Sequence, residues 1–547
     1  MEINKIMIPM MNFQLTITSL MKHADKVNGS VEVVSVTADN PRHRYTYRDA
    51  FVRVRQLANA LAKLGLQAGD TIGTFAWNDY RHLEIYYAVS CSGMICHTIN
   101  PRLFPEQIDY IVNHGGDQWI FVDVAIVPLL EQLQDKMPAV KGFVVMTDRA
   151  HMPDTKLRNM HCYEELIESE LSEFEWPDLD ENTPSALCYT SGTTGNPKGV
   201  MYTHRSTILH CYASISPDAF CLSVKDVTMP IVPMFHVNGW GIVYAAPMTG
   251  AKLVMPGAKM GDGETLCQLI NEEGVTASAG VPTIWLALLD YLAKTGNTVA
   301  SLNRVTVGGA ACPFLIFDTF RTKYGVDVQQ GWGMTEMNPL GTANGNTSPQ
   351  VSALAKEDYD KMRLKQGRPI FGVDLKIVDV DNKELPWDGK SVGAVKVRGP
   401  WIINEYYGYE GKTLDDDGWF ETGDVACMDE FSYMRITDRV KDVIKSGGEW
   451  ISSIELENCA VNHPKVAEAA VVGMPHPTWS ERPLLLLVLR EGESLSREEI
   501  LTWFDGKVAK WWIPEDCLFV DALPHTATGK LSKKDIRETY KDYTWPA

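Results

Sequence analysis

The chain has 547 residues, of which 45% are hydrophobic and 22% charged, and its formal net charge is −19. This length exceeds what one compact core usually holds, so we expect two or more domains. The acidic balance argues against a protein that binds nucleic acid, because phosphate backbones attract basic surfaces, but a local pocket can still bind a small anion.

No segment of the sequence has the pattern of a membrane-spanning helix. The amino terminus lacks a basic start followed by an unbroken apolar core, so we expect no secretory signal. The longest aliphatic run, LLLLVL at 484–489, is too short to cross a bilayer and predicts a buried strand. We therefore expect at most peripheral membrane association.

The eleven cysteines are scattered along the chain, and none forms a CxxC pair. This pattern is typical of reduced, buried thiols in a cytoplasmic protein and argues against a zinc site.

In chain order, the first strong pattern is helical. Thr46 and Asp49 resemble a capping box, apolar residues at helical spacing follow, and Gly65 can end the helix. A strand-like run at 71–77 and a second helical run at 79–94 come next. Strand-like runs then recur at 116–123, 140–146 and 251–255. This alternation predicts the α/β class, with mostly parallel sheets flanked by helices.

The composition changes near 436–453. The segments that follow read as helix (452–464), strand (467–475), strand (481–490) and helix (496–514). About 110 residues are enough for a small α+β domain. We expect a large domain over 1–437, a hinge over 438–443 and a small domain over 444–547.

A loop rich in glycine and hydroxyl side chains follows the apolar run at 186–189. Backbone amides bind phosphate well where side chains do not crowd them, so the loop can wrap a polyphosphate. A flexible surface turn is the competing interpretation. A Walker A loop is excluded, because Lys198 lies three residues past Gly195 and is followed by glycine. The candidate ligands are Thr190, Ser191, Gly192, Thr193, Thr194, Gly195, Lys198 and Gly199.

The full string YTSGTTGNPKGV (189–200) resembles a signature of the adenylate-forming superfamily, which includes acyl-CoA synthetases, luciferases and the adenylation domains of peptide synthetases. Further matches lie in the family's order and cover nearly the whole chain. They are PMFHVNGW (233–240), VGGAACP (307–313), QGWGMTE (330–336), GWFETGD (418–424), DRVKDVIKSGGEW (438–450) and PHTATGK (524–530). The segments 81–103 and 444–452 most resemble the medium- and long-chain fatty acyl-CoA synthetases.

The resemblance implies a two-step reaction that uses ATP, Mg²⁺ and coenzyme A. A carboxylate first attacks the α-phosphate of ATP, which gives an acyl-adenylate and pyrophosphate, and the thiol of coenzyme A then displaces AMP. Because the first step brings anions together, cations and oriented donors must offset their repulsion.

The resemblance also assigns roles around the nucleotide. The loop from Thr190 to Gly199 would cradle the β- and γ-phosphates, Glu336 with Thr190 would hold Mg²⁺, and Thr335 would donate to the α-phosphate. Asp424 would accept both ribose hydroxyls, with Arg439 nearby. The adenine would lie between Trp332 and the backbone of Gly309 and Ala310, and Gly331 is a further nucleotide-binding candidate. Read alone, Glu336 is a solvated carboxylate, Asp424 and Arg439 are a surface pair, and Trp332 is a core residue.

Lys530 lies in a run of small polar residues that suits an exposed loop. The resemblance implies that Lys530 bridges the acid and the α-phosphate during adenylation, and that the small domain rotates about Lys441 between the two half-reactions. After rotation, Gly447 and Gly448 would leave room for the pantetheine arm. Lys445 and Trp450 match positions near the nucleotide or the hinge.

The segment 235–247 is apolar around one histidine and one tryptophan, and it holds no Lys or Arg that could pair with a second carboxylate. An acid with an apolar tail is therefore favoured. By resemblance, His236 borders the acyl site and Trp240 gates it. The remaining lining would come from Val237, Gly239, Gly331 and Pro339.

We expect a synthetase for a medium-chain fatty acid, and relatives of this branch suggest a homodimer. Three alternatives remain open: a ligase for 3-methylthiopropionate (3-methylmercaptopropionate) or for another short or aryl acid, a peptide-synthetase adenylation domain, and an inactive binding protein. The second is disfavoured because the sequence ends at Ala547 without a carrier domain. The third is disfavoured because Glu336, Asp424 and Lys530 are all present.

Overall fold

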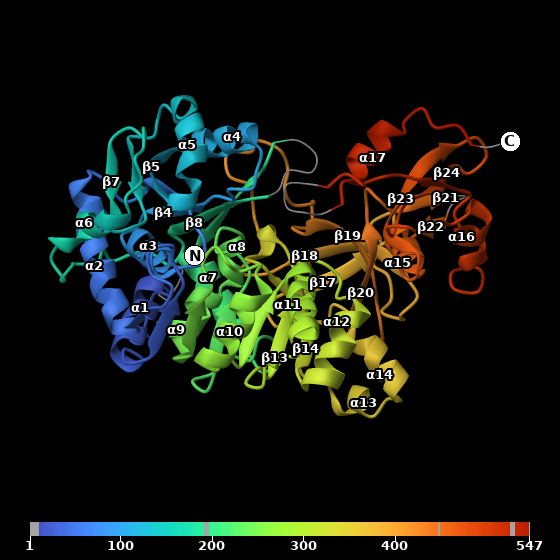
Figure 1. Cartoon of the computed structure of the whole chain (residues 1–547), viewed down its shortest axis with the longest axis horizontal. Helices are drawn as coiled ribbons and strands as arrows, with labels where there is room; N and C mark the ends of the chain where they lie inside the picture. Colours follow the sequence, from blue (N-terminus) through green and yellow to red (C-terminus); the bar gives the residue numbers. More distant parts are fainter. Residues whose placement is uncertain (1–9, 191–195, 447–448, 526–530, 546–547) are drawn as a thin grey trace, which may run out of the picture. The chain divides into compact units, whose positions relative to one another are not determined.

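The computed structural model describes residues 10–190, 196–446, 449–525 and 531–545. The chain forms two compact units (Figure 1). Unit 1 comprises 1–101, 105–373 and 399–413, and unit 2 comprises 102–104, 374–398 and 414–547. The chain thus enters unit 1 once more, over 399–413, between two stretches that belong to unit 2. The predicted domain boundary at 438–443 remains a prediction.

Unit 1 contains a seven-stranded sheet in the order β7-β6-β5-β3-β4-β8-β9. All neighbouring pairs are parallel except β8 and β9, which form an antiparallel hairpin. The strands are β3 (Thr71–Phe75), β4 (Ile95–Thr98), β5 (Asp117–Val122), β6 (Gly142–Val145), β7 (Met160–Cys162), β8 (Pro184–Tyr189) and β9 (Gly199–Thr203).

Unit 1 also contains a nine-stranded sheet in the order β16-β15-β14-β13-β12-β10-β11-β1-β2. Its central pairs are parallel, and antiparallel strands lie at both edges. The strands are β1 (Glu32–Ser35), β2 (His43–Thr46), β10 (Val227–Pro230), β11 (Lys252–Met255), β12 (Ala277–Gly280), β13 (Arg304–Val307), β14 (Asp327–Gly333), β15 (Leu340–Asn344) and β16 (Arg368–Pro369).

The helices of unit 1 pack on these sheets. α3 contacts strands of both sheets, and all twelve of its residues are buried, as expected of a helix enclosed on every side. The helices are α1 (Ile17–Val27), α2 (Tyr47–Lys63), α3 (Tyr80–Cys91), α4 (Pro105–Gly115), α5 (Val127–Leu133), α6 (Tyr163–Glu168), α7 (His204–Ser214), α8 (Val237–Trp240), α9 (Ile242–Thr249), α10 (Gly263–Glu273), α11 (Pro282–Thr295), α12 (Phe314–Thr319), α13 (Pro349–Ser352) and α14 (Lys356–Arg363).

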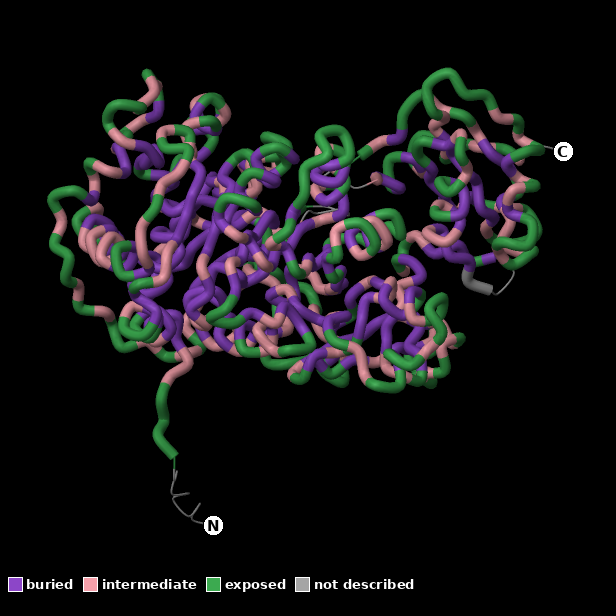
Figure 2. The backbone as a smooth tube through the Cα atoms, turned by 60° about the horizontal axis from the view of Figure 1, so that its bottom comes forward, coloured by how far each residue is buried: buried purple, intermediate pink, exposed green. Residues whose placement is uncertain are grey.

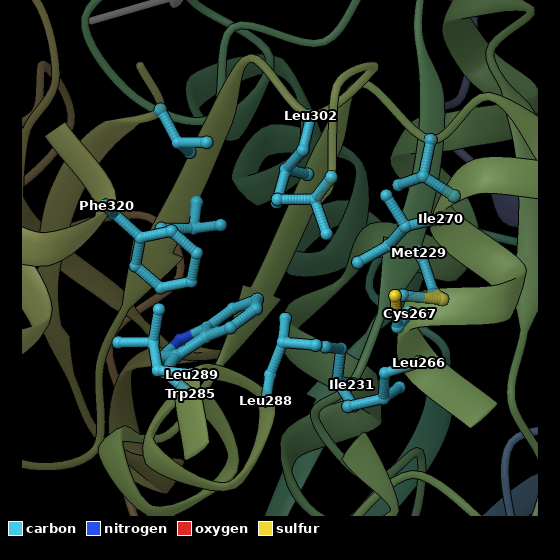
Figure 3. Packing of buried hydrophobic residues seen from close by; sticks show 14 of the residues in the cluster. Met229, Ile231, Leu266, Cys267, Ile270, Trp285, Leu288, Leu289, Leu302 and Phe320 are labelled. Carbon is cyan, nitrogen blue, oxygen red and sulfur yellow. The ribbon is translucent and has the colours of Figure 1, made fainter. Parts of the chain in front are cut away.

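The largest side chain in the core of the nine-stranded sheet is Trp285 of α11, which is fully buried. Figure 3 shows it packed beside Leu288 and Phe320, with Leu266 and Ile270 of α10 close by. Figure 2 shows long buried stretches of chain inside unit 1, and β3, β4 and β6 are buried along their whole length. This packing holds the sheet's parallel strands in place, so that the loops after their carboxyl ends start from fixed positions.

Unit 2 contains two sheets. One is antiparallel: β17 (Asp374–Val378), β18 (Val392–Arg398), β19 (Phe420–Met428) and β20 (Met434–Arg439). The other has the order β22-β21-β24-β23, with β25 parallel to β24. Its strands are β21 (Ile444–Ser446), β22 (Glu449–Ile451), β23 (Val466–His476), β24 (Ser480–Leu489) and β25 (Asp516–Phe519), and its helices are α15 (Ser453–Val461), α16 (Arg497–Trp503) and α17 (Lys533–Thr539).

The predicted α/β class is confirmed, and so are the capping box of Thr46 and Asp49 and the buried strand at 484–489. The helix predicted over 496–514 was too long. α16 ends at Trp503, and Gly506 has a φ of 70°, a left-handed conformation that ends a helical run.

All eleven cysteines are free, and all except Cys221 are buried. Over the described ranges, the structure contains no helix both long and apolar enough to span a membrane.

Candidate active site

The predicted phosphate loop is closed at its base by two hydrogen bonds between Thr190 and Lys198. In the β8–β9 hairpin Tyr189 lies opposite Gly199, and beyond it the Thr190 amide donates to the Lys198 carbonyl at 2.9 Å. The Lys198 amide donates back to the Thr190 hydroxyl at 3.2 Å. The ends of the loop are therefore fixed by the sheet. Ser191, Gly192, Thr193, Thr194 and Gly195 lie outside the described residues.

The segment 399–413, which we call the tyrosine strap, crosses this hairpin. The Tyr407 amide donates to the Gly199 carbonyl at 2.8 Å, and the Ile403 amide donates to the Glu336 carbonyl at 2.8 Å. A Cβ added at Gly199 would meet the Tyr407 Cβ at 3.1 Å, so a glycine at 199 allows the close approach. The strap thus connects the end of the phosphate loop to the segment that carries Glu336.

Tyr406 of the strap links two of the predicted ligands. Its hydroxyl donates to Glu336 Oε1 at 2.7 Å, and its ring centroid lies 4.6 Å from Lys198 Nζ. The Tyr409 ring lies at the same distance from Lys198 Nζ, 4.6 Å. Burial, and then the charge of Glu336, raise the pKa of Tyr406, so its hydroxyl keeps its proton and remains a donor.

Thr335 and Glu336 form part of a short 3₁₀ turn, Thr335–Met337, and both are buried. The hydroxyl of Tyr202, on β9, donates to the Thr335 carbonyl at 2.6 Å. A buried carboxylate beside hydroxyl groups is a hard oxygen ligand, which is the donor chemistry that Mg²⁺ prefers. The side chains present at Glu336 therefore fit a magnesium ion.

The predicted adenine wall comes from two adjacent parallel strands. β13 and β14 pair with Val307 opposite Gln330, so Gly309 and Ala310 follow one strand while Gly331 and Trp332 lie on the other. Trp332 is buried, whereas Gly309 and Ala310 are exposed. The predicted residues are thus brought to the same edge of the sheet.

The predicted acyl segment contains an unusual backbone turn. Four consecutive residues, Val237–Trp240, have φ values between 49° and 59°, and Gly241 continues the turn at 72°. Such left-handed runs are costly for residues that carry a Cβ, and they occur where surrounding structure enforces them. Val237, Gly239 and Trp240 are buried, whereas His236 is exposed and Pro339 is half-buried.

The turn places Trp240 against the adenine wall. A Cβ added at Gly308 would lie 2.7 Å from Trp240 Cη2 and 3.0 Å from the Gly331 carbonyl oxygen. The indole therefore packs directly on the Gly308 backbone. The predicted acyl residue Trp240 and the predicted nucleotide residue Gly331 meet at this point.

The remaining predicted residues belong to unit 2. Asp424 and Arg439 lie opposite each other on β19 and β20, and Arg439 Nε is 2.8 Å from Asp424 Oδ1. Asp424 is buried, whereas Lys441 and Lys445 are exposed. Lys445 pairs with Trp450 along β21 and β22. Lys530, Gly447 and Gly448 lie outside the described residues, as does the side chain of Trp450.

Four residues of this site were not predicted from the sequence: Tyr202, Gly308, Tyr406 and Tyr409. Three tyrosines within EYYGYE (405–410) were a visible signal, because tyrosine supplies both a ring face and a hydroxyl donor. Their partners lie about 70 and 200 positions away in sequence, which local spacing cannot reveal.

Comparison with known proteins identifies the family of the chain. A family model described as AMP-binding enzyme matches residues 21–407, and a second, AMP-binding enzyme C-terminal domain, matches residues 455–530. The chain is 52% identical to a 3-methylmercaptopropionyl-CoA ligase of Ruegeria lacuscaerulensis, covering 97% of this chain and 98% of that protein. It is 47% identical to a medium-chain-fatty-acid–CoA ligase of Ectopseudomonas oleovorans, covering 97% of both proteins.

Among solved structures, an anthranilate CoA ligase in complex with anthranoyl-AMP superposes with a TM-score of 0.83 at 24% identity. The alignment covers 96% of this chain and 97% of that chain, and it supports the same fold. The chain therefore belongs to the AMP-binding enzyme family, and the protein is an AMP-forming acid–thiol ligase.

Proposed function

We propose that the protein activates a medium-chain fatty acid as an acyl-adenylate and transfers the acyl group to coenzyme A, releasing AMP and pyrophosphate. The observation that carries this proposal is the contact network at the phosphate loop, in which Tyr406 touches both Lys198 and Glu336. A cation and a hard anionic ligand held together at a glycine-rich loop suit a metal–polyphosphate complex.

In this proposal the loop from Thr190 to Lys198 binds the β- and γ-phosphates. Glu336, with the Thr190 hydroxyl, holds Mg²⁺, which when bound supplies positive charge to the phosphate oxygens. Thr335 donates to the α-phosphate. Burial of Glu336 strengthens these interactions, since charges interact more strongly away from water.

The nucleoside would be bound by residues on or after β13 and β14 and by a pair of residues on β19 and β20. Trp332 would lie against the adenine, opposite Gly309 and Ala310. Asp424 would accept the ribose hydroxyls and Arg439 would lie nearby. The Asp424–Arg439 ion pair orients the carboxylate, which suits a bidentate acceptor.

The acid would bind beside the Val237–Gly241 turn, with Trp240 at the entrance of its pocket. The turn is buried and uncharged, and this supports an apolar tail. His236, Val237, Gly239, Gly331 and Pro339 would complete the lining.

The two half-reactions would use a mobile small domain over 444–547 and a hinge over 438–443 centred on Lys441. Lys530 would enter for adenylation, and Gly447, Gly448, Lys445 and Trp450 would serve the coenzyme A step. The exposure of Lys441 supports a hinge role, because its own side chain does not have to leave a core when the backbone turns.

A second candidate acid is 3-methylmercaptopropionate, and the 52% identity to a 3-methylmercaptopropionyl-CoA ligase favours it. This acid has the length of pentanoate with one methylene replaced by sulfur. One methylene in an apolar pocket is worth about 1–3 kcal/mol, so a pocket fitted to octanoate should discriminate clearly against both short acids.

The experiment is AMP release by the purified enzyme with ATP, Mg²⁺, coenzyme A and one acid at a time. The acids are butanoate, pentanoate, hexanoate, octanoate, decanoate and 3-methylmercaptopropionate. A maximum of kcat/KM at hexanoate to decanoate supports the medium-chain proposal. A kcat/KM for 3-methylmercaptopropionate far above that of pentanoate, its matched control, would instead assign the second candidate.

We further propose a cytoplasmic homodimer. The free cysteines are compatible with a reducing compartment, where disulfides are rare. Sedimentation of the purified protein would test the oligomeric state, and a single monomeric species at micromolar concentration would overturn the dimer.

A further inference from the structure

The tyrosine strap (399–413) presents two different chemical groups to the phosphate loop. Tyr406 offers a hydroxyl and a ring face, and Tyr409 offers a second ring face. The two rings stand nearly perpendicular, at 87°, with centroids 5.9 Å apart. Lys198 Nζ lies 4.6 Å from the centroid of each ring. Lys198 is exposed on the loop and Glu336 is buried, yet the strap contacts both.

We propose that Tyr406 is a positioning residue for metal-dependent nucleotide binding: its hydroxyl orients the Glu336 carboxylate, while its ring and that of Tyr409 hold the Lys198 ammonium. This inference rests on the proposed function, because it concerns how the same phosphate site is assembled. The strap would thus orient Glu336 and Lys198, a role that none of the motif residues has.

The hydroxyl contact is the stronger of the two. A hydrogen bond to a charged carboxylate restricts the carboxylate to one orientation and is stronger than a bond between neutral groups. Glu336 is also tied through its backbone, because its carbonyl accepts from the Ile403 amide of the same strap. Main chain and side chain of Glu336 are thus held by residues 403 and 406.

The ring contacts act on the cation. An ammonium near the face of a tyrosine is attracted by the ring quadrupole, more weakly at exposed sites than at buried ones. Tyr409 is exposed and Tyr406 is half-buried, so this contribution is modest. Its effect is to limit where Lys198 points, since the backbone of Lys198 is already paired to Thr190.

The two contacts can be separated by mutation. Tyr406→Phe removes the hydroxyl and keeps the ring for Lys198. Tyr409→Leu removes one ring face and leaves the Tyr406–Glu336 bond intact. Tyr212→Phe is the matched control, because Tyr212 lies exposed on α7 and the substitution is the same.

The test measures binding of a fluorescent ATP analogue to the full-length protein, once with EDTA and once with Mg²⁺. For Tyr406→Phe we expect the affinity for the nucleotide analogue in EDTA to be unchanged. The factor by which Mg²⁺ raises that affinity should be roughly tenfold smaller than in the wild type. For Tyr409→Leu we expect affinity in EDTA to fall by roughly threefold, with the Mg²⁺-dependent gain retained. Tyr212→Phe should match the wild type in both conditions.

A merely structural role for Tyr406 predicts a different result: a lower thermal unfolding midpoint without ligand and an unchanged Mg²⁺-dependent gain. That result would overturn the proposal, as would identical behaviour of Tyr406→Phe and Tyr212→Phe. If Tyr406→Phe does not fold, the Tyr409→Leu variant decides the proposal. Wild-type affinity of Tyr409→Leu for the ATP analogue in EDTA would overturn the proposal. Failure of the proposed function is distinct, since the wild type would then show the Mg²⁺-dependent gain yet catalyse no acid-dependent pyrophosphate exchange.

Discussion

Gly308 is the residue where Trp240 packs against the sheet that carries Gly331 and Trp332. A methyl group at this position would lie 2.7 Å from the indole and 3.0 Å from the Gly331 carbonyl oxygen. Trp240 is itself part of the left-handed turn at Val237–Gly241 and is buried, so its indole has little space into which it can move. A change of one carbon at Gly308 should therefore alter the acyl pocket.

For Gly308→Ala we predict a KM for the acid raised by roughly tenfold, since overpacking costs about 1–3 kcal/mol and the indole is the group that must move. The KM for ATP should change less. Steady-state kinetics with each substrate varied in turn would measure both. The control is Gly261→Ala, whose added Cβ would meet only Ile284 Cδ1, at 3.8 Å. Equal rises in the two KM values would contradict this account.

Among the helices, the fully buried α3 has an ionisable residue as its N-terminal cap. Asp79 caps it, and its carboxylate accepts from the His82 amide at 2.9 Å. Complete burial, and then the nearby Asp123, raise the pKa of Asp79 from 3.8 to about 7. The cap thus ionises near neutral pH.

The raised pKa of Asp79 determines whether the folded state gains or loses stability as pH rises. The folded state binds the Asp79 proton more tightly than the unfolded chain does. The contribution of this proton to the free energy of unfolding is therefore fully present below pH 3.8 and is lost as pH rises through about 7. Asn also caps helices and cannot ionise. For Asp79→Asn we predict a gain in unfolding free energy relative to wild type that grows between pH 5 and pH 8, to at most about 4 kcal/mol.

Denaturant unfolding of both proteins across that range would measure the difference. A difference that stays constant between pH 5 and pH 8 would contradict the assignment of Asp79 as a buried acid that ionises near neutrality.

Elements with a local signal were predictable from the sequence, and elements defined by distant contacts were not. The start of α2 was predictable because Thr46 and Asp49 satisfy each other within one turn. The parallel strands were predictable because buried strands read as short apolar runs. The tyrosine strap was missed because its function depends on Lys198 and Glu336, which are remote in sequence. The left-handed turn was missed because Val237 and Trp240 rarely adopt positive φ.

The site residues divide in the same way. Glu336, Thr335 and Trp332 were predicted from a motif, and the structure places them on β14 and the turn that follows it. Gly308 and Tyr406 were not predicted, because the residues that they contact, Trp240 for Gly308 and Lys198 with Glu336 for Tyr406, are remote in sequence.

At the scale of the whole molecule, the proposal divides the chemistry between two half-reactions, and Lys530 belongs to the first. We predict that Lys530→Ala reduces acyl-adenylate formation by several orders of magnitude and leaves thioester formation from supplied acyl-adenylate near the wild-type rate. The reason is that this ammonium would bridge the two reacting anions only during adenylation.

Single-turnover assays of each half-reaction would measure these rates. Lys534→Ala is the matched control, because Lys534 is an exposed lysine of the same segment, on α17. Equal losses in both half-reactions of Lys530→Ala would contradict the alternating use of the small domain.

In the proposed reaction, an acid captures the AMP portion of ATP at the phosphate loop closed by Thr190 and Lys198. The most direct measurement is exchange of labelled pyrophosphate into ATP by the wild-type protein, with Mg²⁺ and octanoate but without coenzyme A. We predict exchange that requires the acid and disappears when the acid is omitted. A protein that binds the nucleotide yet shows no exchange with any acid of the panel would contradict the account.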